Sequence, residues 1–185
     1  MSTPIRVVPS PSVDYEMTAE ALAALGLGRH DHPVEQAPNE AIWLTPDAGT
    51  VVRWVQEDLI DVRYVAVLGA DAVALAERIR TAIPTDDIAR LRARAMADRE
   101  PDVLIDVLYR TAVVAWSGYD TEAFALLRWG LHDPDPLIRR VALLAVSITG
   151  WNEFAGLLDE VSAADPDDDV RDQAARVREL VLSGT

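Results

Sequence analysis

The sequence predicts a mainly α protein in which a small α+β unit precedes a row of antiparallel helices. Residues 40–68 show strand patterns separated by turn residues, which indicates a small sheet. Residues 86–183 divide into amphipathic stretches joined by short breaks rich in aspartate, proline and glycine, a pattern typical of helical hairpins. We therefore expect a flexible arm at 1–14, an α+β unit at 15–84 and a helical region at 86–183.

The α+β unit is expected to contain an antiparallel hairpin or a three-stranded sheet with helices beside it. A short helix is predicted at 17–27, where glycines follow the last apolar position. Strands at 41–44 and 50–55 are separated by Pro-Asp-Ala-Gly, which suits a hairpin turn. Residues 60–68 alternate apolar and polar side chains as a half-buried strand does, and a helix at 71–83 ends before a proline.

In the second half, aspartates or prolines stand at most of the expected helix starts, where they cap or begin a helix well. The breaks between helices are only a few residues long, so consecutive helices should run antiparallel. The expected helices are residues 86–97, 101–115, 121–131, 136–148, 152–163 and 169–182.

Two stretches of the helical region, 133–142 and 165–174, match each other. Each opens on Asp-Pro-Asp and continues with an apolar residue, an arginine and, three residues later, an alanine. This pattern resembles the HEAT repeat, a helical hairpin that stacks into α-solenoids. Residues 106–112 are a candidate degenerate copy without the Asp-Pro turn. The resemblance covers the second half of the chain and implies a short HEAT-like α-solenoid.

The resemblance also implies roles for the matching residues. In the HEAT family the arginine reaches acidic turn residues of a neighbouring repeat, which fixes how the repeats stack. Arg139 and Arg171 would do so here, with Asp133 or Asp165 as acceptors. Because HEAT-like proteins have many functions, the resemblance implies an architecture more than an activity.

The charge and the missing residue types exclude several function classes. The chain has 31 acidic and 17 basic residues, all arginine, and no cysteine. Without lysine there is no Schiff-base nucleophile and no phosphate-loop lysine. Without cysteine there is no thiol nucleophile or thiolate metal site. The net charge of −14 argues against direct contact with nucleic acid and would suit a basic protein partner.

Apolar runs stay well short of the roughly 18 residues that a membrane helix needs, and the first residues do not have the pattern of a secretory signal. We expect a cytoplasmic protein with no membrane partner. Arginine as the sole basic residue, in an alanine-, valine-, leucine- and aspartate-rich chain, is typical of proteins from high-GC bacterial genomes.

Candidate sites for chemistry are few. His30 and His32 are the closest histidine pair and could bind a metal if a third ligand came from elsewhere. No zinc-binding helix motif accompanies them, so we expect ordinary loop histidines, no metal and no cofactor. The aspartates at 165–169 lack the glycine and glutamate of a calcium loop. Serine nucleophile motifs are absent from the sequence, which favours a non-enzymatic protein.

Aromatic side chains near the helix ends are candidate contacts for another protein. Most of them should lie in the core between repeats, and any that is exposed would anchor an interface. Trp129 and Trp151 are the interaction candidates that we single out. The full set is Trp116, Tyr119, Phe124, Trp129, Trp151 and Phe154.

The sequence favours a protein–protein interaction module, either an adaptor or an inhibitor of the immunity-protein type with an acidic surface. The alternative is an enzyme or small-ligand-binding protein with a site between the sheet unit and the solenoid, using His30, His32 or Trp43. A structural subunit of a larger assembly is a third hypothesis.

Overall fold

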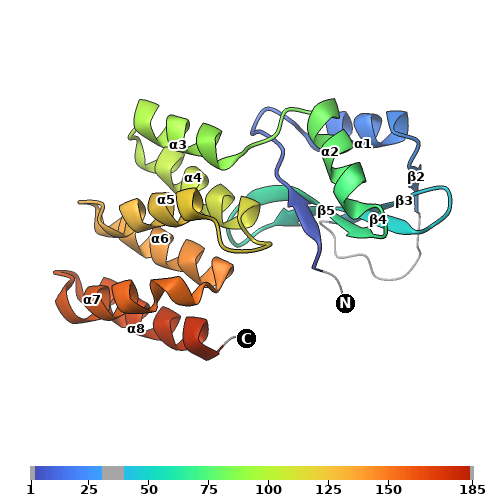
Figure 1. The fold of residues 1–185 in the computed structure, drawn as a ribbon. Coiled ribbons are helices and arrows are strands. Elements are labelled where there is room, and N and C mark those ends of the chain that lie inside the picture. The colour runs from blue at the N-terminus through green and yellow to red at the C-terminus, as the bar shows by residue number, and fades with distance from the viewer. Residues whose placement is uncertain (1–2, 31–39, 184–185) are drawn as a thin grey trace. The chain divides into compact units, whose positions relative to one another are not determined.

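The computed structural model describes residues 3–30 and 40–183, which form two compact units. The first unit ends at Asp87 and the second begins at Ile88. The first contains an antiparallel sheet with helices, and the second is helical throughout (Figure 1). The expectation of a mainly α chain with a sheet preceding the helices is therefore confirmed.

In the first unit the strands form one antiparallel sheet in the order β1-β5-β4-β3-β2. The hairpin between β3 and β4 is closed by the predicted turn, in which the Asp47 carboxylate accepts hydrogen bonds from Thr45 Oγ1 and the Gly49 amide. At the end of β5, Gly69 has a φ of +137°, and a Cβ there would lie 2.3 Å from the Gly49 carbonyl oxygen. The strands are β1 (Ile5–Val7), β2 (Gly28–Arg29), β3 (Glu40–Leu44), β4 (Thr50–Glu57) and β5 (Val62–Gly69).

The sheet is larger than predicted, because the arm expected at 1–14 contributes an edge strand. Ile5–Val7 pairs with β5, and both Val7 and Val8 are buried. Val7 lies in the core of the first unit, and its burial stabilises this segment against the sheet, which proline content alone did not reveal. The two-residue strand β2 was also not predicted.

Two helices cover one face of this sheet, α1 (Tyr15–Ala24) and α2 (Ala72–Ala82) (Figure 1). Trp43 and Trp54 both face these helices and lie in the core with the ring of Tyr15, whose centroid is 6.1 Å and 5.9 Å from theirs. Trp43 is thus a core residue of the first unit.

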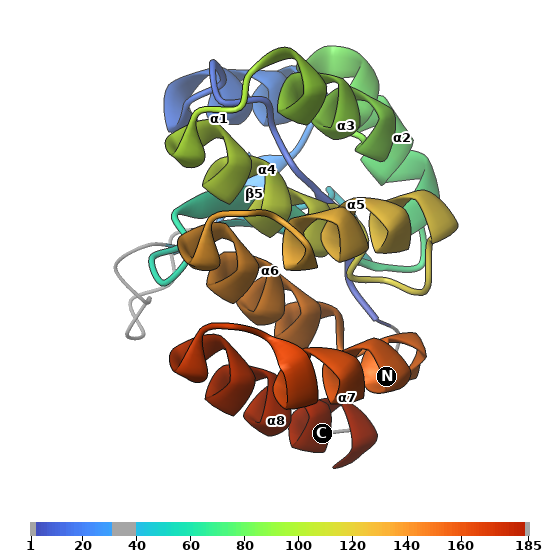
Figure 2. The same cartoon turned by 90° about the vertical axis from the view of Figure 1, so that its left-hand side faces the viewer.

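The second unit consists of three antiparallel hairpins, α3–α4, α5–α6 and α7–α8. Figure 2 shows α3, α5 and α7 in one layer and α4, α6 and α8 in the other, with α4 against α6 and α6 against α8. The helices are α3 (Ile88–Ala97), α4 (Pro101–Val114), α5 (Thr121–Leu131), α6 (Pro136–Thr149), α7 (Ala155–Ala164), preceded by the 3-10 turn η1 (Asn152–Phe154), and α8 (Asp168–Ser183).

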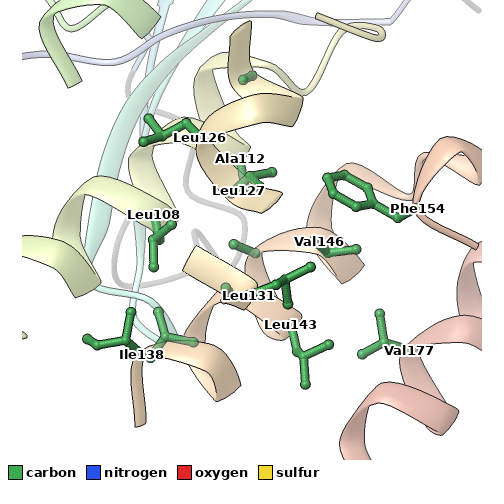
Figure 3. Close-up of a cluster of buried hydrophobic side chains, with 14 of the residues drawn as sticks. Leu108, Ala112, Leu126, Leu127, Leu131, Ile138, Leu143, Val146, Phe154 and Val177 are labelled. Carbon is green, nitrogen blue, oxygen red and sulfur yellow. The ribbon is translucent and has the colours of Figure 1, made fainter. Parts of the chain in front are cut away.

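A continuous apolar core connects the hairpins, with Leu127, Leu131 and Leu143 buried where the two layers meet (Figure 3). The helices approach closely at Gly130, where a Cβ would lie 2.8 Å from a Leu108 methyl and 3.1 Å from the Ala142 Cβ. Glycine in α5 is therefore explained by packing against α4 and α6 rather than by helix propensity. No helix in the described part of the chain has the length and apolar character of a membrane span.

Candidate interaction surface

The three hairpins of the second unit have the same turn between their helices. In each turn an aspartate Oδ1 accepts a hydrogen bond from the amide two residues further on, which fixes the start of the second helix. The pairs are Asp98 with Glu100 at 3.0 Å, Asp133 with Asp135 at 3.0 Å and Asp165 with Asp167 at 2.9 Å. The first turn therefore lies at Asp98, whereas the candidate copy at 106–112 lies inside α4 and is not a turn.

Arg139 joins the second and third hairpins. Its Nε and Nη2 atoms donate to the two carboxylate oxygens of Asp165, both at 2.8 Å, and its Nη1 donates to the carbonyl oxygens of Asp133 and Pro134. Arg139 is 7% exposed, so this bidentate pair is largely shielded from water. The hydrogen bond to Asp165 raises the pKa of Arg139.

The pKa of the Asp165 carboxyl group is shifted in opposite directions by burial and by hydrogen bonding. Burial favours its neutral form, but the hydrogen bonds from Arg139 and the Asp167 amide, with the arginine charge, outweigh burial and hold the pKa of Asp165 below its ordinary value. The pair is therefore ionised in the folded protein at neutral pH.

Arg171 occupies the matching position in α8 but stays within its own hairpin. It donates to the Asp165 carbonyl oxygen, as Arg139 does to that of Asp133, and pairs with the Asp168 carboxylate. No further hairpin follows α8 among the described residues, so no acidic turn lies within its reach. The buried carboxylate of Asp133 forms its ion pair with Arg99 of the first turn, whose Nη2 lies 2.8 Å from Oδ2.

Of the two tryptophans singled out from the sequence, Trp151 is buried and Trp129 is half-buried. Trp151 packs against Phe154 and against Tyr119, whose ring centroid is 5.2 Å away. Tyr119 in turn contacts Phe124. This aromatic cluster positions the exposed Tyr119 beside the N-terminal half of α5.

Two hollows lie on the surface of α5, and Ala125 and Trp129 line both of them. The first has a volume of about 610 Å³ and is lined by residues from Tyr119 to His132. The second, of about 220 Å³, lies between α3 and α5 with Met96 and Leu126 on its walls. Together they form a groove, called here the α5 groove, whose lining is Arg92, Ala95, Met96, Tyr119, Thr121, Phe124, Ala125, Leu126, Arg128, Trp129 and His132.

Large side chains beside the α5 groove have unusually high exposed fractions. Met96 is 76% exposed, and Tyr119 is 48% exposed. Beside them the guanidinium of Arg99 stacks over the Trp129 ring, 4.3 Å from its centroid, which holds one ring face while the indole still lines both hollows. An exposed apolar patch next to aromatic side chains is typical of a surface that another molecule covers.

Comparisons give this chain no relative. No protein-family model, curated protein or solved structure matches it. Inference about function therefore depends on the surface of the chain itself, and above all on the α5 groove.

Of the two metal candidates, the structure describes His30. His30 lies directly after β2 in the first unit, and its amide donates to the Ile42 carbonyl oxygen. His32 lies outside the described residues. Within the described ranges, no group of three or more histidine, aspartate or glutamate side chains is placed to hold a metal ion.

Sequence reasoning missed Met96 and Arg128 as surface candidates. Met96 occurs near the end of an Arg-Ala-rich helix, where no periodicity distinguishes an exposed methionine from a core one. Tyr119 and Phe124 belonged to the aromatic set, but only the packing of Trp151 and Phe154 distinguishes the exposed ring from the buried ones.

Proposed function

We propose that the second unit is a short HEAT-like α-solenoid and that the protein acts as a non-enzymatic interaction module, an adaptor or inhibitor, that binds another protein. The repeated aspartate turn and the Arg139–Asp165 bridge between hairpins support the solenoid. The observation on which the binding function depends is the α5 groove, with its exposed Met96 and its half-buried Trp129.

The shape and chemistry of the α5 groove suit a peptide or helix better than a small metabolite. Both hollows are open to solvent, and together they run along the face of α5 from Tyr119 to His132. Small-molecule sites usually enclose most of their ligand, whereas partner segments bind in open grooves through a few anchor side chains. Met96, Tyr119 and Trp129 are of the residue types that supply such anchors.

Site-specific photocrosslinking in cells tests this function. A benzophenone side chain at Ala125, which is exposed and lines both hollows, should give a discrete crosslinked product with another protein. The matched control is the same group at Leu180, an exposed residue of α8 in the opposite helix layer, which should give none. Crosslinking at Leu180 but not at Ala125, or at neither, would contradict the proposal.

The binding should also depend on the apolar walls. Met96→Glu changes a side chain that is already exposed, so it should leave folding intact and abolish the product formed at position 125. Circular dichroism of the purified variant checks that its helices are unchanged. A product that persists in this variant would mean that the hollow between α3 and α5 takes no part in binding.

A further inference from the structure

The α5 groove differs in charge from the rest of the chain. The chain has a net charge of −14, yet among the described residues that line the two hollows there is no aspartate or glutamate. The charged side chains that line them are Arg92 and Arg128, with His132 at the far end of α5. Helix α3, which forms one wall, has three arginines and no acidic residue.

Two of the nearby arginines already have partners. Arg92 pairs with Glu122, and Arg99 is held by the buried carboxylate of Asp133 while it stacks on Trp129. Their charges are therefore largely compensated within the protein.

Arg128 is different. It is exposed on α5, and its guanidinium makes no ion pair or hydrogen bond with any described residue. It lies one turn after Phe124 and one turn before His132, so the three side chains share one face of the helix. His132 Nδ1 donates to the Arg128 carbonyl oxygen at 2.8 Å, which directs the other ring nitrogen away from that bond. The groove thus combines apolar walls with an uncompensated cation.

We propose that the α5 groove binds an acidic segment of the partner protein, with a carboxylate on Arg128 and a neighbouring large apolar side chain in the hollow beside Met96 and Trp129. This rests on the proposed function and names the chemistry of its partner. A guanidinium pairs with a carboxylate in a bidentate arrangement, and the apolar walls would bind leucine, methionine or aromatic side chains. The basic partner that the net charge of the chain suggests does not suit this surface.

Selection from a phage-displayed library of random 12-residue peptides tests the proposal with the intact protein. Peptides enriched on the wild type should combine aspartate or glutamate with large apolar residues, and Arg128→Glu should remove the acidic preference. The control is Arg140→Glu on α6, where the arginine is also exposed but lies in the other helix layer; it should leave the selected sequences unchanged. Enrichment of lysine or arginine, acidic peptides retained by Arg128→Glu, or no enrichment at all would overturn the proposal.

Fluorescence anisotropy with one selected peptide gives the magnitude. Arg128→Glu replaces an attraction by a repulsion and should weaken binding at least about tenfold, which corresponds to about 1.4 kcal/mol. Equal affinity of the wild type and Arg128→Glu would contradict the role of Arg128. Crosslinking at Ala125 together with a failed peptide selection would overturn the acidic occupant and leave the interaction function standing, whereas absence of crosslinking would reject that function itself.

A second copy of this acidic chain is the remaining occupant. Light scattering separates it from a different protein: the wild type should be monomeric at micromolar concentration. A dimer that Arg128→Glu disperses would show that the segment in the groove belongs to the chain itself and would overturn the assignment to a partner protein.

Discussion

Replacing Arg139 by alanine should destabilise the second unit strongly, because it leaves the buried carboxylate of Asp165 without its cation. Side-chain exposures of 9% for Arg139 and 6% for Asp165 place the pair among buried ion pairs. Removing one member of such a pair costs about 3–5 kcal/mol. Since Asp165 keeps the hydrogen bond from the Asp167 amide, we expect the lower end, about 3 kcal/mol.

Urea unfolding followed by circular dichroism measures this loss of unfolding free energy, and thermal unfolding measures the corresponding decrease in Tm. For a unit of the size of Ile88–Thr185, each kcal/mol lowers Tm by about 4–8 °C, so the expected decrease is about 12–24 °C. Arg140→Ala is the matched control, because its exposed side chain is 3.8 Å from the carboxylate of Asp169, which is exposed as well. That substitution should change the unfolding free energy by no more than about 0.5 kcal/mol.

A double-mutant cycle with Asp165→Ala distinguishes the bridge from the general packing of a long side chain. The arginine stem also covers apolar surface, so Arg139→Ala alone mixes both effects. A direct bridge predicts a coupling energy of at least about 1 kcal/mol between the two sites. Additive single substitutions, or equal losses in Arg139→Ala and Arg140→Ala, would refute the interpretation that this pair fixes the stacking of the hairpins.

Three further results are expected from unfolding measurements. Because the pKa of Asp165 is lowered in the folded state, the bridge contributes fully above the ordinary value of 3.8 and is lost as the pH falls through the lower folded value, so the penalty of the arginine substitution should shrink in titrations below pH 3.8. Gly69→Ala should cost about 3 kcal/mol, since its φ of +137° and a backbone oxygen 2.3 Å from the new Cβ both oppose a side chain, whereas Gly118→Ala, with open space around it, should be nearly neutral. Asp120→Ala should cost about 1 kcal/mol because its carboxylate caps α5, while Asp71→Ala should cost little because that side chain makes no capping bond.

The positions of the helices in the second unit follow from the sequence because strong local signals mark their ends. Helix α5 has the predicted bounds, and α4 and α6 end within one residue of them. Asp120 caps α5 and Pro136 begins α6. Local hydrogen bonding and the fixed φ of proline therefore determine these helix starts without help from long-range packing.

Which face of a short helix is buried could not be predicted as well. Helical spacing places Met17 on the side of Leu22 in α1, and Val73 on the side of Ile79 in α2, yet Met17 and Val73 are 44% and 70% exposed. In α1 the expected Leu22 is buried, and Thr18 is buried in place of Met17. A helix of about ten residues has several candidate apolar stripes, and the sheet beneath it selects one through long-range packing that no local pattern contains.

The repeat copy predicted at 106–112 is wrong, because the first turn, at Asp98, lacks the arginine on which that prediction depended. The second and third turns are each followed by an arginine, Arg139 or Arg171, and the first hairpin has Leu104 at that position. The signal that remains is an acid at each end of the turn followed by proline, Asp98-Arg99-Glu100-Pro101, which matches the turn at Asp133. The arginine has moved into the turn, where Arg99 pairs with Asp133. The feature that the three turns share is therefore the aspartate that accepts from the backbone amide, and not the arginine that follows.

The sign of the charge on the α5 groove could not be read from composition, and the reason is physical. Net charge sums every side chain, but a bound segment interacts with the few groups within about 10 Å, beyond which salt screens exposed charges. In this chain the acidic excess includes residues that cap helices or sit in turns, as Asp120, Asp133 and Asp165 do, and their carboxylates are engaged by backbone amides and arginines. The guanidinium of Arg128, in contrast, has no such partner among the described residues. A surface of a strongly acidic protein can therefore bind an acidic segment when the nearby carboxylates are engaged in caps, turns and ion pairs and an exposed arginine is not.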